Sequence, residues 1–302
     1  MKALISGSSG LVGSNLASYL EYQGYEVYKL VRSIKQVDER CIYWDPQAGI
    51  LEANELEGFD VVVHLAGENI ADKRWTEKQK NKISHSRIVS TQLLSDRLAN
   101  LKHKPQVFIS ASAIGYYADR PFETLYEHSY PVEGIFISDT CSKWEAAASQ
   151  AREAGIRVVH PRFGIILSKE SGALSKLLLP FSLGLGGVIG HGQQFMSWIG
   201  IEDVIYALFF VMNNPEISGP VNFTSPNPVT NAVFTKTLAR VLDRPALAPL
   251  PSFLAKIVFG EMADALLLAS AKVKPKVLED AGFKFSQARL EDCFVTGLQL
   301  SS

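Results

Sequence analysis

The first half of the chain alternates short apolar runs with segments in which apolar residues recur at helical spacing. Residues 2–6 form an apolar run typical of a buried parallel strand, and from Leu11 the apolar positions follow a helical period through Leu16 and Leu20. Strand-like runs return at residues 26–31, 60–66, 106–110 and 157–161, with helical patterns at residues 76–101 and 138–154. This alternation predicts an α/β fold, in which a Rossmann-type doubly wound parallel sheet carries helices on both faces.

The pattern changes after Arg162. Residues 172–200 are rich in glycine and aromatic residues and show no clear period, which predicts a loop-rich wall. Regular structure resumes with a helix at 201–213, a strand at 219–224, a helix at 232–242, a helical run to about 271, and a short helix with a glycine turn at 278–285. We therefore expect a Rossmann domain over residues 1–165, rejoined by about 200–235, and a smaller C-terminal lobe within 166–302.

Three glycines connect the first strand to the first helix. Gly7, Gly10 and Gly13 lie three residues apart, where backbone N–H groups point outward at the positive end of the helix dipole. Gly7 would make the tight turn, Gly10 would admit phosphates against bare backbone, and Gly13 would allow close packing of helix on strand. The alternative is a plain strand-to-helix turn. We predict a dinucleotide site that is contacted by Gly7, Ser9, Gly10, Leu11, Val12 and Gly13.

The second strand ends at Val31, Arg32 and Ser33, where the adenosine ribose of a dinucleotide is expected. An acidic residue at this place would favour NAD, whereas the guanidinium group of Arg32 suits the 2′-phosphate of NADP by charge and by forked hydrogen bonding. The alternative is a solvated arginine. We therefore predict NADP (NADPH) as the cofactor.

A further cofactor contact is expected where the strand at 60–66 ends, at Leu65, Ala66, Gly67 and Glu68. His64 lies in the apolar run itself, and we interpret it as a packed, hydrogen-bonded core residue. In the following helix, Lys82 and Arg87 either belong to a solvated face or turn toward the cofactor phosphates.

Candidate catalytic residues follow the strand at 106–110. Ser112 is placed to polarise a carbonyl or alcohol beside the nicotinamide, although its hydroxyl has the alternative of a local bond to its own turn. Tyr116 and Tyr117 are nearby phenols, and either ring can be turned away by the geometry of the turn. In the loop-rich wall, Gln194, Met196 and Trp198 are candidate substrate contacts, with an ordinary core position as the alternative for Trp198.

Composition favours a small-molecule partner. The net charge of the 302 residues is -1 and there is no long Lys/Arg run, which disfavours nucleic acid and anionic membranes. Cys41, Cys141 and Cys293 are widely spaced, so neither a disulfide framework nor a metal site is indicated. No run approaches the roughly 18 apolar residues of a membrane span. We expect a cytoplasmic protein, and we allow for a homodimer.

Several stretches resemble the extended short-chain dehydrogenase/reductase superfamily, namely its nucleotide-sugar epimerase and dehydratase group. The resemblance is closest to an atypical branch, the epimerase-family proteins with a C-terminal domain of unknown function, whose members are sometimes labelled cell-division inhibitors. It covers nearly the whole chain and rests on HLAGEN at 64–69, RW at 74–75, SRIVSTQLL at 86–94, SASAIGYY at 110–117, KWEAAA at 143–148, LLPFSLGLGG at 178–187, WIGIEDV at 198–204, NFTSPNPVTNAVF at 222–234 and PKVLEDAGFKF at 275–285.

The resemblance implies an NADP-dependent epimerase or oxidoreductase acting on a small hydroxyl or carbonyl compound, such as a nucleotide sugar. Superfamily chemistry uses Ser, Tyr and Lys, with the last two spaced Tyr-x-x-x-Lys. Lys143 matches that lysine, which binds the cofactor ribose, and Arg162 is a further expected cofactor contact, but Asp139 stands in place of the tyrosine. Two interpretations therefore remain open: an enzyme with a different proton donor, and a non-catalytic NADP(H)-binding sensor or interaction protein.

Overall fold

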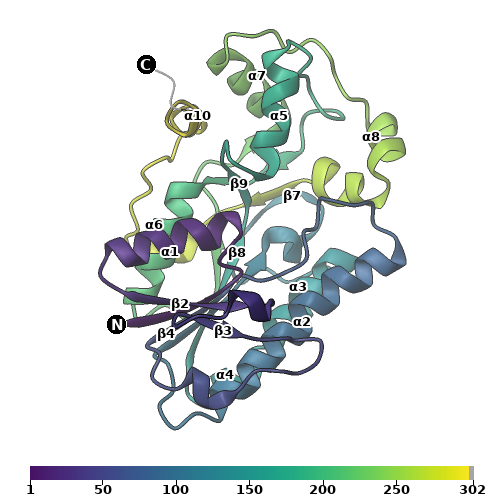
Figure 1. Ribbon diagram of the computed structural model, residues 1–302. Helices are drawn as coiled ribbons and strands as arrows, with labels where there is room; N and C mark the ends of the chain where they lie inside the picture. The colour runs from purple at the N-terminus through teal and green to yellow at the C-terminus, as the bar shows by residue number, and fades with distance from the viewer. Residues whose placement is uncertain (299–302) are drawn as a thin grey trace.

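The centre of the molecule is a parallel sheet in the strand order β12-β8-β5-β4-β1-β2-β3 (Figure 1). The computed structural model describes residues 1–298. The strands are β1 (Lys2–Ser6), β2 (Glu26–Val31), β3 (Cys41–Tyr43), β4 (Val61–His64), β5 (Val107–Ser110), β8 (Arg157–Phe163) and β12 (Gly219–Phe223), and the short β6 (Ser112–Ala113) pairs with β8. The order reverses between β1 and β4, where ligands of open α/β sheets bind.

Helices cover both faces of this sheet, which confirms the predicted Rossmann-type fold. On one face α1 (Leu11–Tyr22) and α6 (Ile201–Asn213) pack over Ala3 and Ile5 of β1. On the other face α2 (Glu77–Ala99) and α4 (Ser149–Glu153) pack over Leu4. Successive residues of β1 thus enter opposite cores, as the twofold period of a strand requires, so the apolar run is continuous.

The helical pattern predicted over 138–154 is divided into α3 (Phe136–Ala146) and α4. The break has a local cause. The backbone N–H of Ala151 donates to Ser95 Oγ of α2 at 2.9 Å rather than continuing the helical ladder to residue 147. The contact also fixes α4 against α2.

The prediction of a loop-rich wall was wrong for its first part, because Gly172–Ser182 forms helix α5. Leu174, Leu177, Leu178 and Phe181 lie at helical spacing and pack into the core of the C-terminal lobe. The helical pattern is short, and the glycines that follow α5 hide it in the sequence. After them come the short strands β10 (Phe195–Met196) and β11 (Trp198–Gly200), and β11 pairs with β9 (Ile165–Leu167).

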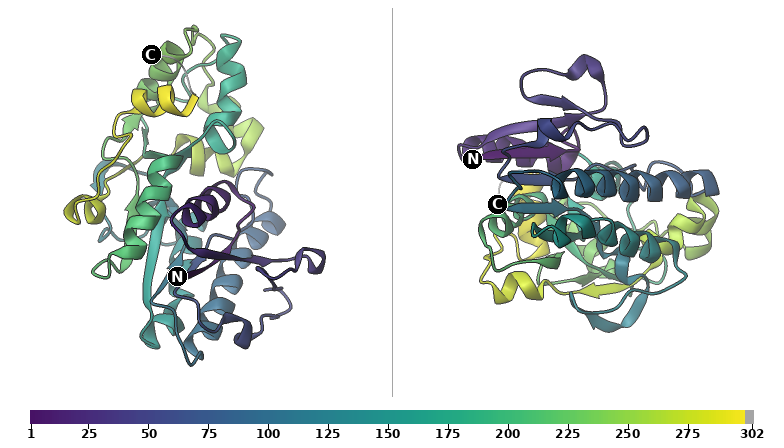
Figure 2. Two further views of the ribbon diagram at one scale, coloured as in Figure 1. Left: turned by 60° about the vertical axis from the view of Figure 1, so that its left-hand side comes forward. Right: turned by 90° about the horizontal axis from the view of Figure 1, so that it is seen from below.

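The C-terminal lobe lies beyond the carboxyl ends of the sheet strands, since β8 leads through β9 into α5 (Figure 2). It contains β13 (Val229–Thr230), α7 (Asn231–Val241), α8 (Ser252–Phe259), a π-helical turn (Ala263–Leu268) and α10 (Leu290–Leu298). Helix α9 (Lys276–Asp280) instead packs on the central sheet, where Leu278 joins the core beneath α6. Strand β14 (Ala271–Val273) pairs in parallel with β7 (Arg120–Leu125), so a segment of the first half of the chain anchors the lobe. The domain boundaries near 165, 200 and 235 stay predictions.

Phe294→Ala is expected to lower the free energy of unfolding by about 3–5 kcal/mol, because its fully buried ring packs edge-to-face on Phe234 in the lobe core. Phe122→Ala is the matched control, since that ring is 98% exposed and its loss should change stability by less than about 0.5 kcal/mol. Urea denaturation of both variants measures the difference. Similar losses would contradict the assignment of α10 to the lobe core.

Candidate functional site

The turn between β1 and α1 has the geometry of a phosphate cradle. Gly7 has φ +70° and packs so closely that a Cβ would lie 2.8 Å from the backbone nitrogen of Ala66. A Cβ on Gly13 would lie 2.2 Å from the carbonyl oxygen of Gly7. At Gly10, by contrast, a Cβ would meet only that same oxygen, at 3.4 Å. The turn is therefore packed where helix meets strand and open at Gly10, where a pyrophosphate would approach the first N–H groups of α1.

The end of β4 is held against this cradle by a buried hydroxyl. Ser6 Oγ accepts hydrogen bonds from the backbone nitrogens of Leu65 at 3.2 Å and Ala66 at 3.3 Å. It also bonds to His64 Nδ1 at 2.6 Å, while His64 Nε2 bonds to Ser90 Oγ at 3.0 Å. His64 is thus a packed core residue, as interpreted, and Leu65 to Gly67 lie beside Gly7.

The three basic residues that were predicted to contact the cofactor lie in different surroundings. Arg32 is exposed at the end of β2, the strand next to β1, and Lys82 is exposed on α2. Arg87 is half-buried: its Nη1 donates to the carbonyl oxygens of Glu68 and Ile83, each at 3.0 Å, and its guanidinium lies 5.1 Å from the Trp144 ring. Arg87 therefore closes the Gly67–Glu68 turn, whereas Arg32 leaves its guanidinium group open to solvent.

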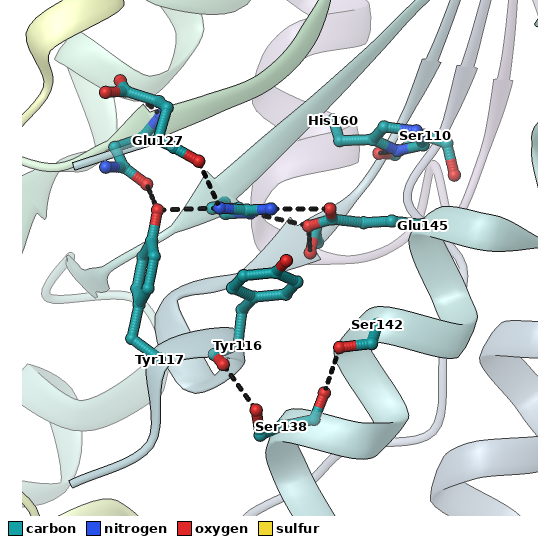
Figure 3. Close-up of polar contacts among 11 residues, drawn as sticks. Ser110, Tyr116, Tyr117, Glu127, Ser138, Ser142, Glu145 and His160 are labelled. Carbon is teal, nitrogen blue, oxygen red and sulfur yellow. Dashed lines mark hydrogen bonds and ion pairs between the residues drawn. The ribbon is translucent and has the colours of Figure 1, made fainter. Parts of the chain in front are cut away.

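Ser112 at the start of β6, Glu145 of α3 and Arg162 of β8 form a connected polar network. Figure 3 draws polar contacts of this region and labels Glu145 and the nearby Tyr116 and Tyr117. Ser112 Oγ donates to Glu145 Oε1 at 2.6 Å. Arg162 donates to the same carboxylate from Nε to Oε1 at 2.7 Å and from Nη2 to Oε2 at 2.8 Å. Burial is the largest single influence and lowers the pKa of Arg162, but the hydrogen bonds and charge of Glu145 and Tyr117 together outweigh it, so the pKa lies above its ordinary value. Arg162 and Glu145 thus form a bidentate ion pair.

The adjacent residues Tyr116 and Tyr117 differ in burial and in their hydrogen bonds. Tyr117 is fully buried: its hydroxyl donates to Asn222 Oδ1 at 2.7 Å and accepts from Arg162 Nη1 at 2.8 Å. Burial raises the pKa of Tyr117 to about 12, against the opposing effect of Arg162. Tyr116 is half-buried, and the Arg162 guanidinium carbon lies 3.5 Å from the centre of its ring. The Tyr117 hydroxyl thus has protein partners on both sides, whereas Tyr116 is the less buried of the two phenols. A catalytic role for either residue stays a prediction.

The expected substrate contacts belong to the interior of the lobe. Trp198 is fully buried and donates from Nε1 to the carbonyl oxygen of Asn227 at 3.1 Å, so the core alternative holds. Gln194 is buried, and its Nε2 donates to the carbonyl oxygens of Ile189 and Leu267. Met196 is half-buried in β10 and accepts from Asn231. Trp198 and Gln194 are thus interior residues of the lobe, and a substrate contact by any of the three stays a prediction.

Comparison with known proteins identifies the family to which the chain belongs. Residues 3–223 match the model of the NAD dependent epimerase/dehydratase family, and residues 250–295 match a domain of unknown function, DUF1731. The chain belongs to the NAD dependent epimerase/dehydratase family. It is 40% identical over 281 residues to an epimerase family protein of Mycobacterium leprae, covering 93% of this chain and 90% of that one.

Two solved structures are also similar. Human epimerase family protein SDR39U1 (isoform 2), solved with NADPH, has a TM-score of 0.91 and 32% identity, with both chains covered completely. A nucleoside-diphosphate sugar epimerase of Corynebacterium glutamicum has a TM-score of 0.80 and 32% identity, with 99% of this chain and 58% of that chain covered. The family's dinucleotide cofactor suits the open cradle at Gly10.

Helix α3 carries Lys143, which matches the lysine of the family's Tyr-x-x-x-Lys pair. Lys143 is exposed on α3, two residues from Glu145 and so about 200° around the helix from it. The face that meets the Ser112–Tyr116 turn is formed by Ile137 and Cys141, since a Cβ on Gly115 would lie 2.6 Å from Ile137 Cγ1 and 3.8 Å from Cys141 Sγ. The role of Lys143 in binding the cofactor ribose stays a prediction.

Sequence reasoning missed the central residue, Glu145. Its only signal was the stretch KWEAAA at 143–148, which carries a resemblance to the family but assigns no partner to the carboxylate. Asn222 and Glu127 were missed as well: Glu127 accepts from the backbone nitrogens of Asn222 and Val277, both at 3.1 Å. Within residues 1–298, no group of three or more His, Cys, Asp or Glu could hold a metal ion, and no helix is long and apolar enough to cross a membrane.

His64 predicts a loss of stability in mild acid. Burial lowers its pKa from 6.5 to about 3, so between these values the unfolded chain binds a proton that the folded chain does not. Stability should thus fall as the pH falls through this window, by about 2 kcal/mol at pH 5 from this residue alone. In His64→Asn, the free energy of unfolding measured at pH 7 and pH 5 should change by about 2 kcal/mol less than in wild type. Equal changes would contradict a neutral buried imidazole.

Proposed function

We propose that this chain is an NADP(H)-binding oxidoreductase or epimerase that acts on a small hydroxyl or carbonyl compound, with nucleotide sugars as the first substrate class to test. The observation that carries the proposal is the cradle, packed at Gly7 and Gly13 and open at Gly10. The relatives support it: the human structure contains NADPH, and the corynebacterial protein is named a nucleoside-diphosphate sugar epimerase.

Different residues of the chain would bind different parts of the dinucleotide. The N–H groups of Leu11 and Val12 at the start of α1 would hold the pyrophosphate, and Arg32 would pair with the 2′-phosphate at the end of β2. Ala66 and Gly67 would leave room for the dinucleotide to cross the sheet edge. The nicotinamide ring, when bound, supplies a hydride donor or acceptor.

Proton transfer would fall to Tyr116. Its ring is held by the Arg162 guanidinium, and the hydroxyl of Ser138 donates to the Tyr116 carbonyl oxygen at 2.5 Å, so the turn is anchored on both sides. A phenol fixed beside a hydroxyl-bearing strand end is positioned to give or take a proton at the reacting oxygen.

The second candidate is an NADP(H)-binding protein without turnover. One observation favours it: the α3 positions that meet the Ser112–Tyr116 turn carry Ile137 and Cys141, which are both buried and cannot replace a Tyr–Lys pair. Such a protein would keep the cradle and report cofactor binding to a partner.

NADPH is expected to stabilise the chain more than NADH does at equal concentration, because Arg32 offers a charged partner to the 2′-phosphate. At about 100 times its dissociation constant a ligand adds roughly 2.7 kcal/mol, so thermal melts can rank the two. Arg32→Asp should remove or reverse the preference. Arg152→Asp, at an exposed position on α4, is the matched control. An equal or larger shift with NADH would refute the assignment of NADP.

Tyr116→Phe is expected to reduce turnover by about 10²- to 10⁴-fold, because it keeps the ring on Arg162 but removes the phenol. Ser112→Ala should reduce it by at least about tenfold. Tyr130→Phe, at an 83% exposed ring, is the control. NADPH absorbance and product stereochemistry should both be followed with nucleotide sugars and simple carbonyls, since epimerisation can leave absorbance unchanged. Tight NADPH binding without turnover in either assay would favour the second candidate.

A further inference from the structure

Ser90 of α2 sets the direction of the hydrogen bonds around the buried His64. Ser90 Oγ lies 2.6 Å from the Ser86 carbonyl oxygen and 3.2 Å from the Arg87 carbonyl oxygen. Because carbonyl oxygens only accept, the single hydroxyl proton of Ser90 is used on this side. His64 Nε2, which is 3.0 Å from Ser90 Oγ, is therefore the donor in the bond between them.

The tautomer of His64 follows from this direction. The ring is fully buried, and burial lowers the pKa of His64 to about 3, so the neutral ring carries a single N–H at pH 7. With that proton on Nε2, Nδ1 only accepts, and the Ser6 hydroxyl donates to it at 2.6 Å. Both lone pairs of Ser6 Oγ then remain for the backbone N–H groups of Leu65, at 3.2 Å, and Ala66, at 3.3 Å.

Ala66 depends most on this arrangement. The Leu65 nitrogen also donates to the Ser6 carbonyl oxygen at 3.2 Å, whereas the bond of the Ala66 nitrogen goes to the Ser6 hydroxyl. The Ala66 nitrogen lies against Gly7, where a Cβ would approach it to 2.8 Å. A displacement of Ala66 would therefore change the space beside the cradle, where a dinucleotide would cross the sheet edge.

The same part of α2 also holds the other end of the segment 65–68. Ser86 Oγ accepts from the backbone nitrogen of Glu68 at 3.0 Å, and Arg87 Nη1 donates to the Glu68 carbonyl oxygen at 3.0 Å. Ser86, Arg87 and Ser90 lie within little more than one helical turn. One short stretch of α2 thus fixes Glu68 directly and Ala66 through a relay of side chains.

We infer that Ser90 is a positioning residue for the dinucleotide site, because it fixes His64 as the Nε2–H tautomer. The inference rests on the proposed function. In Ser90→Ala the buried Nε2–H has lost its acceptor, so the proton is expected on Nδ1 instead. Three N–H groups, those of His64, Leu65 and Ala66, then compete for the two lone pairs of Ser6 Oγ, and the bond to Ala66 is weakened.

The test uses the full-length protein labelled with ¹⁵N-histidine. In a long-range ¹H–¹⁵N NMR spectrum at pH 7, wild-type His64 should show a protonated Nε2 and an unprotonated Nδ1. His64→Asn identifies its signals among those of the six histidines. Ser90→Ala should move the proton to Nδ1 and weaken NADPH binding, measured by calorimetric titration, about fivefold, as expected for the loss of one neutral hydrogen bond.

Ser95→Ala is the matched control. Ser95 is also buried on α2, and its Oγ accepts from the backbone nitrogen of Ala151 at 2.9 Å, so this variant likewise loses one buried hydrogen bond. It should keep the Nε2–H tautomer of His64 and bind NADPH within about twofold of wild type, because its hydroxyl is not part of the relay.

A wild-type His64 that is protonated on Nδ1 would overturn the inference, and this measurement needs no variant to fold. The inference would also be overturned by an Nε2–H tautomer that persists in Ser90→Ala, or by equal losses of NADPH affinity in Ser90→Ala and Ser95→Ala. Wild type that binds neither NADPH nor NADH rejects the proposed function. NADPH binding that is unchanged in Ser90→Ala rejects this inference alone.

Discussion

The buried ion pair between Arg162 and Glu145 joins the parts of the molecule that form the site. Arg162 lies at the end of β8 and Glu145 on α3, and the pair extends through Ser112 to β6 and through Tyr117 and Asn222 to β12. Removing one partner of a buried pair typically costs about 3–5 kcal/mol, because an uncompensated charge stays behind. The pair holds these strand ends together and also takes up hydrogen bonds of Ser112 and Tyr117.

The orientation of α3 follows from contacts on three sides. Trp144 Nε1 donates to Thr91 Oγ1 at 2.9 Å and places one face on α2, while Ile137 packs on Gly115. Glu145 then bonds to Arg162, and Lys143 is exposed. A four-residue spacing places two side chains on one face of a helix, but it does not say which face meets the sheet.

This limit separates what the sequence could predict from what it could not. The sheet, its helices and the glycine cradle follow from local patterns, since buried parallel strands are apolar runs and the cradle needs glycines at fixed spacing. The Ser112–Glu145 contact and the pairing of β7 with β14 join residues far apart in sequence. Trp198 shows the same limit, because an aromatic residue in a glycine-rich stretch is compatible with a pocket wall and with a core.

The glycine cradle and the Ser112–Glu145–Arg162 network therefore depend on different kinds of contact, the first on backbone groups and the second on side chains. The cradle consists of backbone N–H groups at the start of α1 and depends on the absence of Cβ atoms at Gly7 and Gly13, with the Ser6 hydroxyl holding the end of β4 beside it. The side-chain network is made of residues whose positions depend on one another: Ile137 and Cys141 pack α3 against the turn, and Ser112 donates to the Glu145 carboxylate that Arg162 also binds. A change in any of these three polar residues therefore disturbs the hydrogen bonds of the other two.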